Sequence, residues 1–133
     1  MNGNTKKLTL SLKKKWFEMT KSGIKTEDYR EITPYWCNRL LNNTYQKTYN
    51  KEFWKELIKD ENQLYKRLKY IIYFTGEKKF KTTTLTLGYP KSTDTERIIK
   101  FEHLGIEIRT GNPEWGAEEG KLYFVIKHGK QID

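Results

Sequence analysis

A lysine, an aspartate and an arginine, Lys25, Asp28 and Arg30, fall within six residues directly after Gly23. A nearby arginine lowers the pKa of a lysine, a carboxylate within reach raises it again, and burial decides the balance. The lysine can therefore act as a general base, as a phosphate clamp or as the partner in a plain salt bridge. We take Lys25, Asp28 and Arg30 as candidate catalytic residues.

A straight strand through this segment would separate the candidate side chains. Alternation along a strand puts Lys25 on one face and Asp28 and Arg30 on the other. Lys25 and Asp28 can meet only if residues 24–27 turn or bulge. A cleft therefore predicts a bent backbone at residues 24–27, and a straight strand predicts a solvated row of alternating charges.

Several aromatic and basic side chains are candidates for binding a ligand. Trp36 and Trp115 can stack a base, as Tyr35 can, although core burial is the commoner fate of tryptophan. Lys13 marks either a barrel mouth or the solvated start of a helix. Arg39, four residues after Tyr35, either contacts the ligand or packs beside that ring. The predicted ligand-binding residues are Lys13, Lys25, Tyr29, Arg30, Trp36, Arg39 and Trp115.

A second carboxylate would be needed for acid–base chemistry. Glu114 precedes Trp115 in a glycine-flanked loop, and loops held by a rigid scaffold carry function more often than their share. We therefore add Glu114 to the catalytic candidates. Glu102 and Glu107, in the preceding strand region, are its rivals, and the sequence does not separate them.

Cysteine and histidine usage argues against a metal site. Cys37 is the single cysteine and can form no internal disulfide, which fits a reducing cytoplasm. His103 and His128 are distant along the chain from each other and from Cys37, so we predict no metal and no cofactor. We interpret both histidines as surface or hydrogen-bonded residues rather than catalytic bases.

The charge balance points to an anionic partner. The chain of 133 residues carries 26 Lys and Arg against 17 Asp and Glu, a formal net charge of +9. Such a field favours nucleic acid, although a lysine-rich surface can also simply stay solvated. No apolar run approaches the roughly 20 residues of a membrane span, and the segment MNGNTKK lacks the apolar core of a secretory signal. We expect a cytoplasmic protein with no membrane partner.

The first half of the chain predicts a strand followed by helices. Residues 7–12, KLTLSL, alternate as a half-buried strand does, and the next residues have helical spacing up to Gly23. Thr33-Pro34 reads as an N-cap and first helical residue of a helix reaching about Leu41, which Asn42-Asn43 breaks. Residues 50–69 predict an amphipathic helix with a basic outer face, interrupted near Asp60.

The second half changes to a strand-like composition. The segments YIIYF, TTTLTLGY, RIIKFEHLGIEIR and KLYFVIKHG predict four strands, and TGNPEWGAEEG a structured loop or one helical turn. We predict an α+β fold in one domain, residues 1–133, with a helical insertion at about 43–69. Its mixed sheet of five to six strands should curl or close into a barrel flanked by two to four helices.

The segment GIKTEDYR, residues 23–30, resembles the signature of the ASCH domain family, a branch of the PUA-like β-barrel fold. Gly23, Lys25 and Arg30 match that signature, and Asp28 stands where the family has glutamate. The strings LSLKKKWFEM, YREITPYWCNRL and NPEWGAEEGKLYFVIKHG resemble small ASCH-like proteins of phages and prophages. The resemblance leaves residues 43–69 uncovered.

This resemblance implies a PUA-like barrel whose cleft binds RNA or a modified nucleobase through the lysine and the acid of the motif. Some family members are ribonucleases, and others are amidohydrolases that act on acylated cytidine. In the amidohydrolases a threonine nucleophile occupies the position of Asp28, and Thr26 is displaced from it by two residues. An RNA- or nucleotide-binding module is our first hypothesis. A hydrolase using the same residues, or a phage protein that binds a host protein through the basic helix, are the alternatives.

Overall fold

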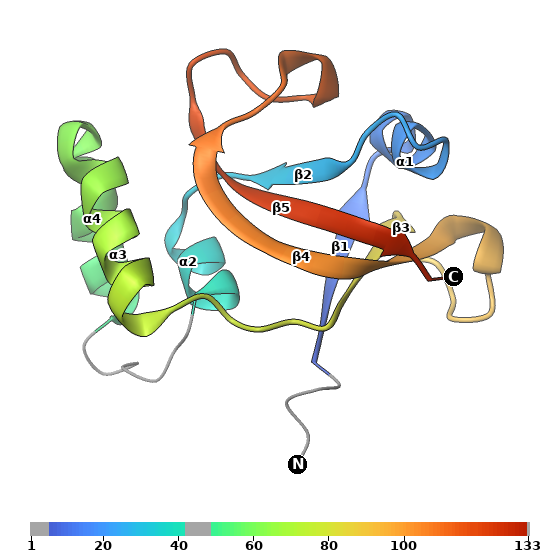
Figure 1. Ribbon diagram of the computed structural model, residues 1–133, viewed down its shortest axis with the longest axis horizontal. Coiled ribbons are helices and arrows are strands. Elements are labelled where there is room, and N and C mark those ends of the chain that lie inside the picture. Colours follow the sequence, from blue (N-terminus) through green and yellow to red (C-terminus); the bar gives the residue numbers. More distant parts are fainter. Residues whose placement is uncertain (1–5, 42–48, 133) are drawn as a thin grey trace.

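The computed structural model describes residues 6–41 and 49–132, and within these ranges five strands form one curled, mixed sheet flanked by four helices (Figure 1). The strands are β1 (Lys7–Leu12), β2 (Glu27–Arg30), β3 (Thr82–Leu87), β4 (Ile98–Thr110) and β5 (Leu122–Gln131). The helices are α1 (Lys14–Lys21), α2 (Pro34–Leu40), α3 (Lys51–Lys59) and α4 (Glu61–Thr75), with short 3-10 turns η2 (Thr95–Arg97) and η3 (Pro113–Trp115). The predicted α+β class with a curled sheet is confirmed.

The sheet curls because its longest strand is bent. The strand order is β1-β3-β4-β5-β2, in which β1 pairs with β3 in parallel and the other neighbours are antiparallel. The β4–β5 register shifts on either side of His103, and such bulges increase twist and bend a strand. Figure 1 shows β4 sweeping around the sheet as a long arc, so that β1 and β2 face each other across the half-barrel.

A side chain joins the two edges of this sheet. Arg30 of β2 donates from Nη2 to the carbonyl oxygen of Ser11 in β1, at 3.1 Å, and from Nη1 to the carbonyl oxygen of Tyr29, at 2.9 Å. Burial lowers the pKa of Arg30 below its ordinary value. The guanidinium therefore ties β1 to β2 at a point where the sheet order provides no backbone ladder.

The core follows the alternation that the sequence predicts for residues 7–12. Leu8, Leu10 and Leu12 point inward from β1, at 7% exposure or less, while their neighbours face outward. Removing each such side chain from water contributes about 1.5–3 kcal/mol to folding. The most deeply buried apolar side chains around them are Phe17, Leu40, Leu41, Leu68, Leu85, Phe124 and Ile126.

The predicted helix boundaries around the motif are confirmed. Gly23 follows the end of α1 with a φ of 87°, a conformation that glycine adopts at little cost. Thr33 caps α2, because its Oγ1 accepts a hydrogen bond from the Trp36 N–H at 3.2 Å, and Pro34 is the first helical residue. The chain between them must therefore turn back toward the sheet.

The prediction of a strand at YIIYF is wrong. Residues 70–74 belong to α4, which begins after a break at Asp60, as predicted, but continues to Thr75. Leu68 and Ile71 keep the buried face of this helix against the core, so tertiary packing overrides the strand-like composition. The predicted break at Asn42-Asn43 lies outside the described residues. In the part of the chain that the structure covers, no helix has the length and apolar character to cross a membrane.

Candidate functional site

The backbone bends between α1 and β2. Residues 24–26 form no strand, and β2 begins only at Glu27. The N–H of Lys25 donates to the carbonyl oxygen of Met19 in α1 at 3.0 Å, which turns the chain against the end of the helix. The bent backbone that a cleft requires is therefore present, and the side chains of Lys25 and Asp28 meet.

Lys25, Asp28 and His128 form a buried chain of polar contacts, each of them at 7% exposure or less. The ammonium group of Lys25 donates to Oδ1 of Asp28, and to the carbonyl oxygen of Glu27 at 2.7 Å. The other carboxylate oxygen, Oδ2 of Asp28, lies 2.6 Å from Nε2 of His128. We call these three residues the Lys25–Asp28–His128 cluster.

Burial and charge shift the pKa values in this cluster. Burial lowers the pKa of Lys25 from 10.5, and the charge of Asp28 offsets only part of that effect. Burial alone would raise the pKa of Asp28, but the hydrogen bond from His128 and the charge of Lys25 outweigh it and hold this pKa below 3.8. Asp28 is thus ionised at neutral pH, and Lys25 gives up its proton more readily than an exposed lysine.

His128 is the member of the cluster that sequence reasoning missed. The register of β2 and β5 pairs Asp28 with Ile126, so His128, two residues further, projects on the same face as Asp28. Its ring stacks on Phe101 at 5.3 Å between centroids. Its Nδ1 is buried with no hydrogen-bond partner among the described residues. Of the two interpretations given for this histidine, a surface position is excluded by its burial, and a hydrogen-bonded one agrees with its contact to Asp28. A correct strand register was the only signal that would have placed it beside Asp28.

An open cleft of about 600 Å³ lies over the cluster, within the roughly 300–1,000 Å³ of small-ligand pockets. Its lining residues are Leu12, Lys13, Trp16, Lys25, Asp28, Tyr29, Arg30, Glu31, Thr33, Tyr35, Trp36, Trp115, Gly116 and Tyr123. All the predicted ligand-binding residues except Arg39 are among them. Trp16 was missed, because its helical spacing indicated only core packing.

Two walls of the cleft are aromatic. On one side Trp36, in the first turn of α2, lies under the guanidinium of Arg30 at 5.3 Å and meets Tyr35 edge-to-face at 5.0 Å. The loop around η3 brings Gly116 against Trp16 of α1, and Trp16 and Trp115 both line the cleft. Gly116 has a φ of 101°, and a Cβ there would lie 3.0 Å from the Trp16 ring. The glycine thus permits both the turn and the close approach.

A second polar cluster holds the η3 loop in place beside the cleft. The hydroxyl of Tyr29 donates to Oε2 of Glu27 at 2.6 Å and accepts from the N–H of Asn112 at 2.9 Å. Arg109 pairs with the same Glu27 carboxylate, donating from Nη1 at 3.0 Å. Burial and the bond to Glu27 raise the pKa of Tyr29 to about 12. These residues position the loop that carries Trp115.

The structure keeps two predicted site residues out of the cleft. Glu114 is exposed and is not part of the lining, and its backbone N–H donates to Oδ1 of Asn112, which caps the η3 turn. Arg39 also lies outside the lining; its charge adds to the burial that lowers the pKa of Lys78. Local sequence placed both residues beside aromatics, but helix and turn geometry direct them away.

The rival carboxylates also lie elsewhere. Glu102 accepts a hydrogen bond from the Lys130 N–H at 3.2 Å, and Glu107 pairs with Arg109 and Lys127. Within the cleft lining, Asp28 and Glu31 are the acidic residues among those that the structure describes. Any acid–base chemistry in the cleft must therefore use Glu31 or the residues of the Lys25–Asp28–His128 cluster.

The described residues contain no group of three or more His, Cys, Asp and Glu side chains placed to hold a metal ion. His103 contacts Oγ1 of Thr83 through Nδ1 at 2.9 Å. Burial, with the charge of His128, lowers the pKa of His103 to about 4. Cys37 is buried, which raises the pKa of its thiol to about 12 and leaves it unreactive.

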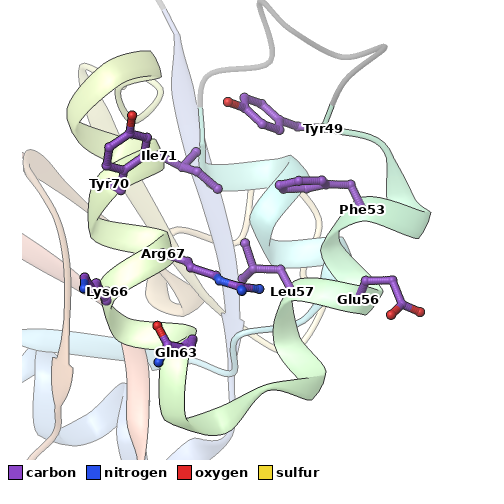
Figure 2. A pocket seen from close by; sticks show the side chains of 9 residues that line it. All are labelled: Tyr49, Phe53, Glu56, Leu57, Gln63, Lys66, Arg67, Tyr70 and Ile71. Carbon is purple, nitrogen blue, oxygen red and sulfur yellow. The ribbon is translucent and has the colours of Figure 1, made fainter.

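A separate hollow of about 680 Å³ lies between α3 and α4 (Figure 2). Figure 2 shows that Phe53 and Leu57 come from α3, and that Arg67 and Ile71 come from α4. Its polar residues, Glu56, Gln63, Lys66 and Arg67, are all exposed. Unlike the cleft, this hollow has no buried polar group that could orient a ligand, so we place the functional site in the cleft.

Comparison of the chain with protein-family models, with curated proteins and with solved structures gave no match in any of the three. The site is therefore interpreted from its own geometry and chemistry.

Proposed function

We propose that the cleft binds a nucleotide of single-stranded RNA. The observation that carries this proposal is the combination, in one hollow, of three tryptophan side chains with Lys25 and Asp28, the two members of the Lys25–Asp28–His128 cluster that line it. Aromatic platforms stack bases of any sequence, and basic side chains neutralise the adjacent phosphates. The resemblance of residues 23–30 to the ASCH motif favours RNA as the nucleic acid and a PUA-like fold for the curled sheet.

The cluster supplies polar recognition at the base of the cleft. Lys25 has three N–H donors, and the contacts within the described chain use two of them, on Asp28 and on the carbonyl oxygen of Glu27. The third donor makes no hydrogen bond to the described residues, and Lys25 is part of the cleft lining, so this donor is the one that an acceptor on the ligand would use. Because Asp28 and His128 fix the ammonium group, this donor is preorganised, which reduces the entropy cost of binding. The exposed Lys13, also in the cleft lining, is the cation that would neutralise a phosphate of the bound nucleotide.

The proposal is tested by titrating a fluorescent single-stranded RNA decamer with the native protein and with Trp36→Ala. We expect affinity to fall steeply as salt rises, and Trp36→Ala to weaken binding about tenfold through loss of stacking. Tyr73→Ala is the matched control, because Tyr73 is exposed on α4 far from the cleft lining, and it should bind as the native protein does. Salt-independent binding, or no binding to any RNA tested, would contradict the proposal.

A hydrolase that uses the same cluster is the second candidate. The observation in its favour is the lowered pKa of the buried Lys25, which a general base requires. A threonine nucleophile is not supplied by Thr26, because its side chain is exposed and lies outside the cleft lining. Incubation with labelled RNA, and separately with acylated cytidine, decides between the candidates. Turnover that Lys25→Ala abolishes would favour the enzyme.

A partner protein bound by the basic face of α3 and α4 remains a prediction of the sequence. It would appear as a stoichiometric complex that Lys25→Ala and Trp36→Ala leave intact.

A further inference from the structure

The cleft continues into a second hollow along β1. This hollow, of about 560 Å³, shares Leu12, Lys13, Trp16, Arg30, Tyr35 and Trp36 with the cleft, and adds Ser11, Thr86 and Tyr89. We call it the β1 lobe. Because one set of aromatic and basic side chains lines both spaces, a ligand that leaves the cleft over Trp36 enters the β1 lobe directly.

The β1 lobe has an aromatic side chain of its own. Tyr89 is 96% exposed, in the turn that follows β3. That turn is anchored on the carbonyl oxygen of Gly88, which accepts hydrogen bonds from the hydroxyls of Ser11 at 3.1 Å and Thr86 at 2.8 Å. A solvent-exposed ring on a fixed turn is the form that a stacking platform takes. The cleft therefore offers one set of aromatic rings, and the β1 lobe offers a further ring.

The charge of the β1 lobe favours a polyanion. Among the described residues that line it none is acidic, whereas Lys13 and Arg30 are basic. Lys14 and Lys15 follow Lys13 at the start of α1, and both are exposed. A phosphodiester that joined a base in the cleft to a base in the β1 lobe would pass this group of cations.

A peptide strand that pairs with the free edge of β1 is the other class of occupant to consider. Strand addition needs the backbone groups of that edge to be open. The carbonyl oxygen of Ser11 already accepts a hydrogen bond from Arg30 at 3.1 Å, so an added strand would have to displace this contact. The observations thus favour nucleic acid over peptide.

We infer that the cleft and the β1 lobe together bind two consecutive nucleotides, so that the ligand is an oligonucleotide and not a free nucleotide. This inference rests on the proposed function. It adds Tyr89, a residue outside the cleft, as the platform for the second base.

The test compares dissociation constants for uridine monophosphate, the dinucleotide UpU and the corresponding uridine tetranucleotide, all at one salt concentration. We expect UpU to bind about tenfold more tightly than the mononucleotide, and the tetranucleotide to add little more. Tyr89→Ala should remove most of the gain from mononucleotide to dinucleotide, and Tyr89→Phe should retain it, because the ring is what stacks. Tyr73→Ala on α4, with an exposed tyrosine removed elsewhere, should keep the full gain.

The results that contradict the inference differ from those that contradict the proposed function. Equal affinity for mononucleotide and dinucleotide, or a gain that Tyr89→Ala leaves unchanged, overturns the inference while the proposed function stands. No binding of any nucleotide overturns both. Binding of an uncharged threonine–valine hexapeptide that competes with UpU and needs Tyr89 would assign the β1 lobe to peptide and overturn the inference.

Discussion

Three polar side chains in this protein are buried next to one another, and their burial is the source of their unusual properties. Lys25, Asp28 and His128 are each nearly inaccessible, yet each has a partner, which is the condition under which buried polar groups are tolerated. Removing Lys25 leaves the carboxylate of Asp28 buried with only His128 as its partner, and breaking a buried charge pair in this way costs about 3–5 kcal/mol. Binding assays on Lys25→Ala therefore need a parallel measurement of the free energy of unfolding.

The stability of the fold should depend on His103 in mild acid. Burial lowers its pKa from 6.5 to about 4. Between these values the unfolded chain binds a proton that the folded chain does not, so the free energy of unfolding falls as pH falls. The loss is at most about 3 kcal/mol. Urea unfolding at pH 7 and pH 4.5 should show a smaller pH dependence for His103→Asn than for the native protein. An unchanged dependence would contradict this explanation.

Strands and turns bring together residues that are far apart in the sequence. The pairing of β2 with β5 places His128 beside Asp28, and the loop between β4 and β5 brings Gly116 against Trp16 of α1. The half-barrel is the rigid support of these residues. The bend after Gly23 turns the chain so that Lys25 reaches Asp28. The cleft is thus a product of the sheet register and of two glycine turns.

Substitution of Gly116 should damage the cleft beyond its effect on the backbone. Gly116→Ala places a Cβ at a φ of 101° and 3.0 Å from the Trp16 ring, so the wall formed by Trp16 and Trp115 must shift. Gly120→Ala is the matched control, because its φ of 76° brings similar strain but its Cβ would have nothing within 4 Å. Each should lose about 1 kcal/mol of stability.

RNA binding separates the two variants. We expect Gly116→Ala alone to weaken binding, about tenfold, in the fluorescence titration. Equal affinities of the two variants would show that the contact with Trp16 has no part in the site.

Local signals in the sequence were sufficient for some elements and not for others. The alternation of residues 7–12 and the cap at Thr33 depend on near neighbours, and both are confirmed. The strand predicted at residues 70–74 fails because the packing of α4 on the core, and not composition, decides its structure. His128 was missed because strand register depends on contacts 100 residues apart. Residues 25, 28, 29 and 30 of the motif, with the predicted Trp36 and Trp115, lie in the lining of one cleft, whereas no local signal indicated Trp16 there.

Across the whole molecule, the net charge is positive, and six of the 14 residues that line the cleft are aromatic. The net charge of +9 gives a long-range attraction for nucleic acid that carries no sequence information. The exposed Lys14 and Lys15 beside the cleft add a local concentration of charge. The overall field should therefore set the association rate, and the cleft should set where the RNA is held.

The salt dependence of binding should report the local charge. Replacing Lys14 and Lys15 with glutamine should reduce the slope of log affinity against log salt by about 1.4, since each phosphate contact with a single strand contributes about 0.7. The same charge change at Lys51 and Lys55 of α3, outside the cleft lining, should leave the slope nearly unchanged. Equal effects of the two pairs would mean that RNA binds diffusely.

The four tryptophans allow the most direct test of RNA binding in the cleft. Trp16, Trp36 and Trp115 line the cleft, whereas Trp54 is 3% exposed in the core. In a proton–nitrogen correlation spectrum, titration with single-stranded RNA should shift the three indole N–H signals of the cleft and leave that of Trp54 in place. Shifts confined to signals of α3 and α4, or no shift at any of the three cleft indoles, would contradict the account.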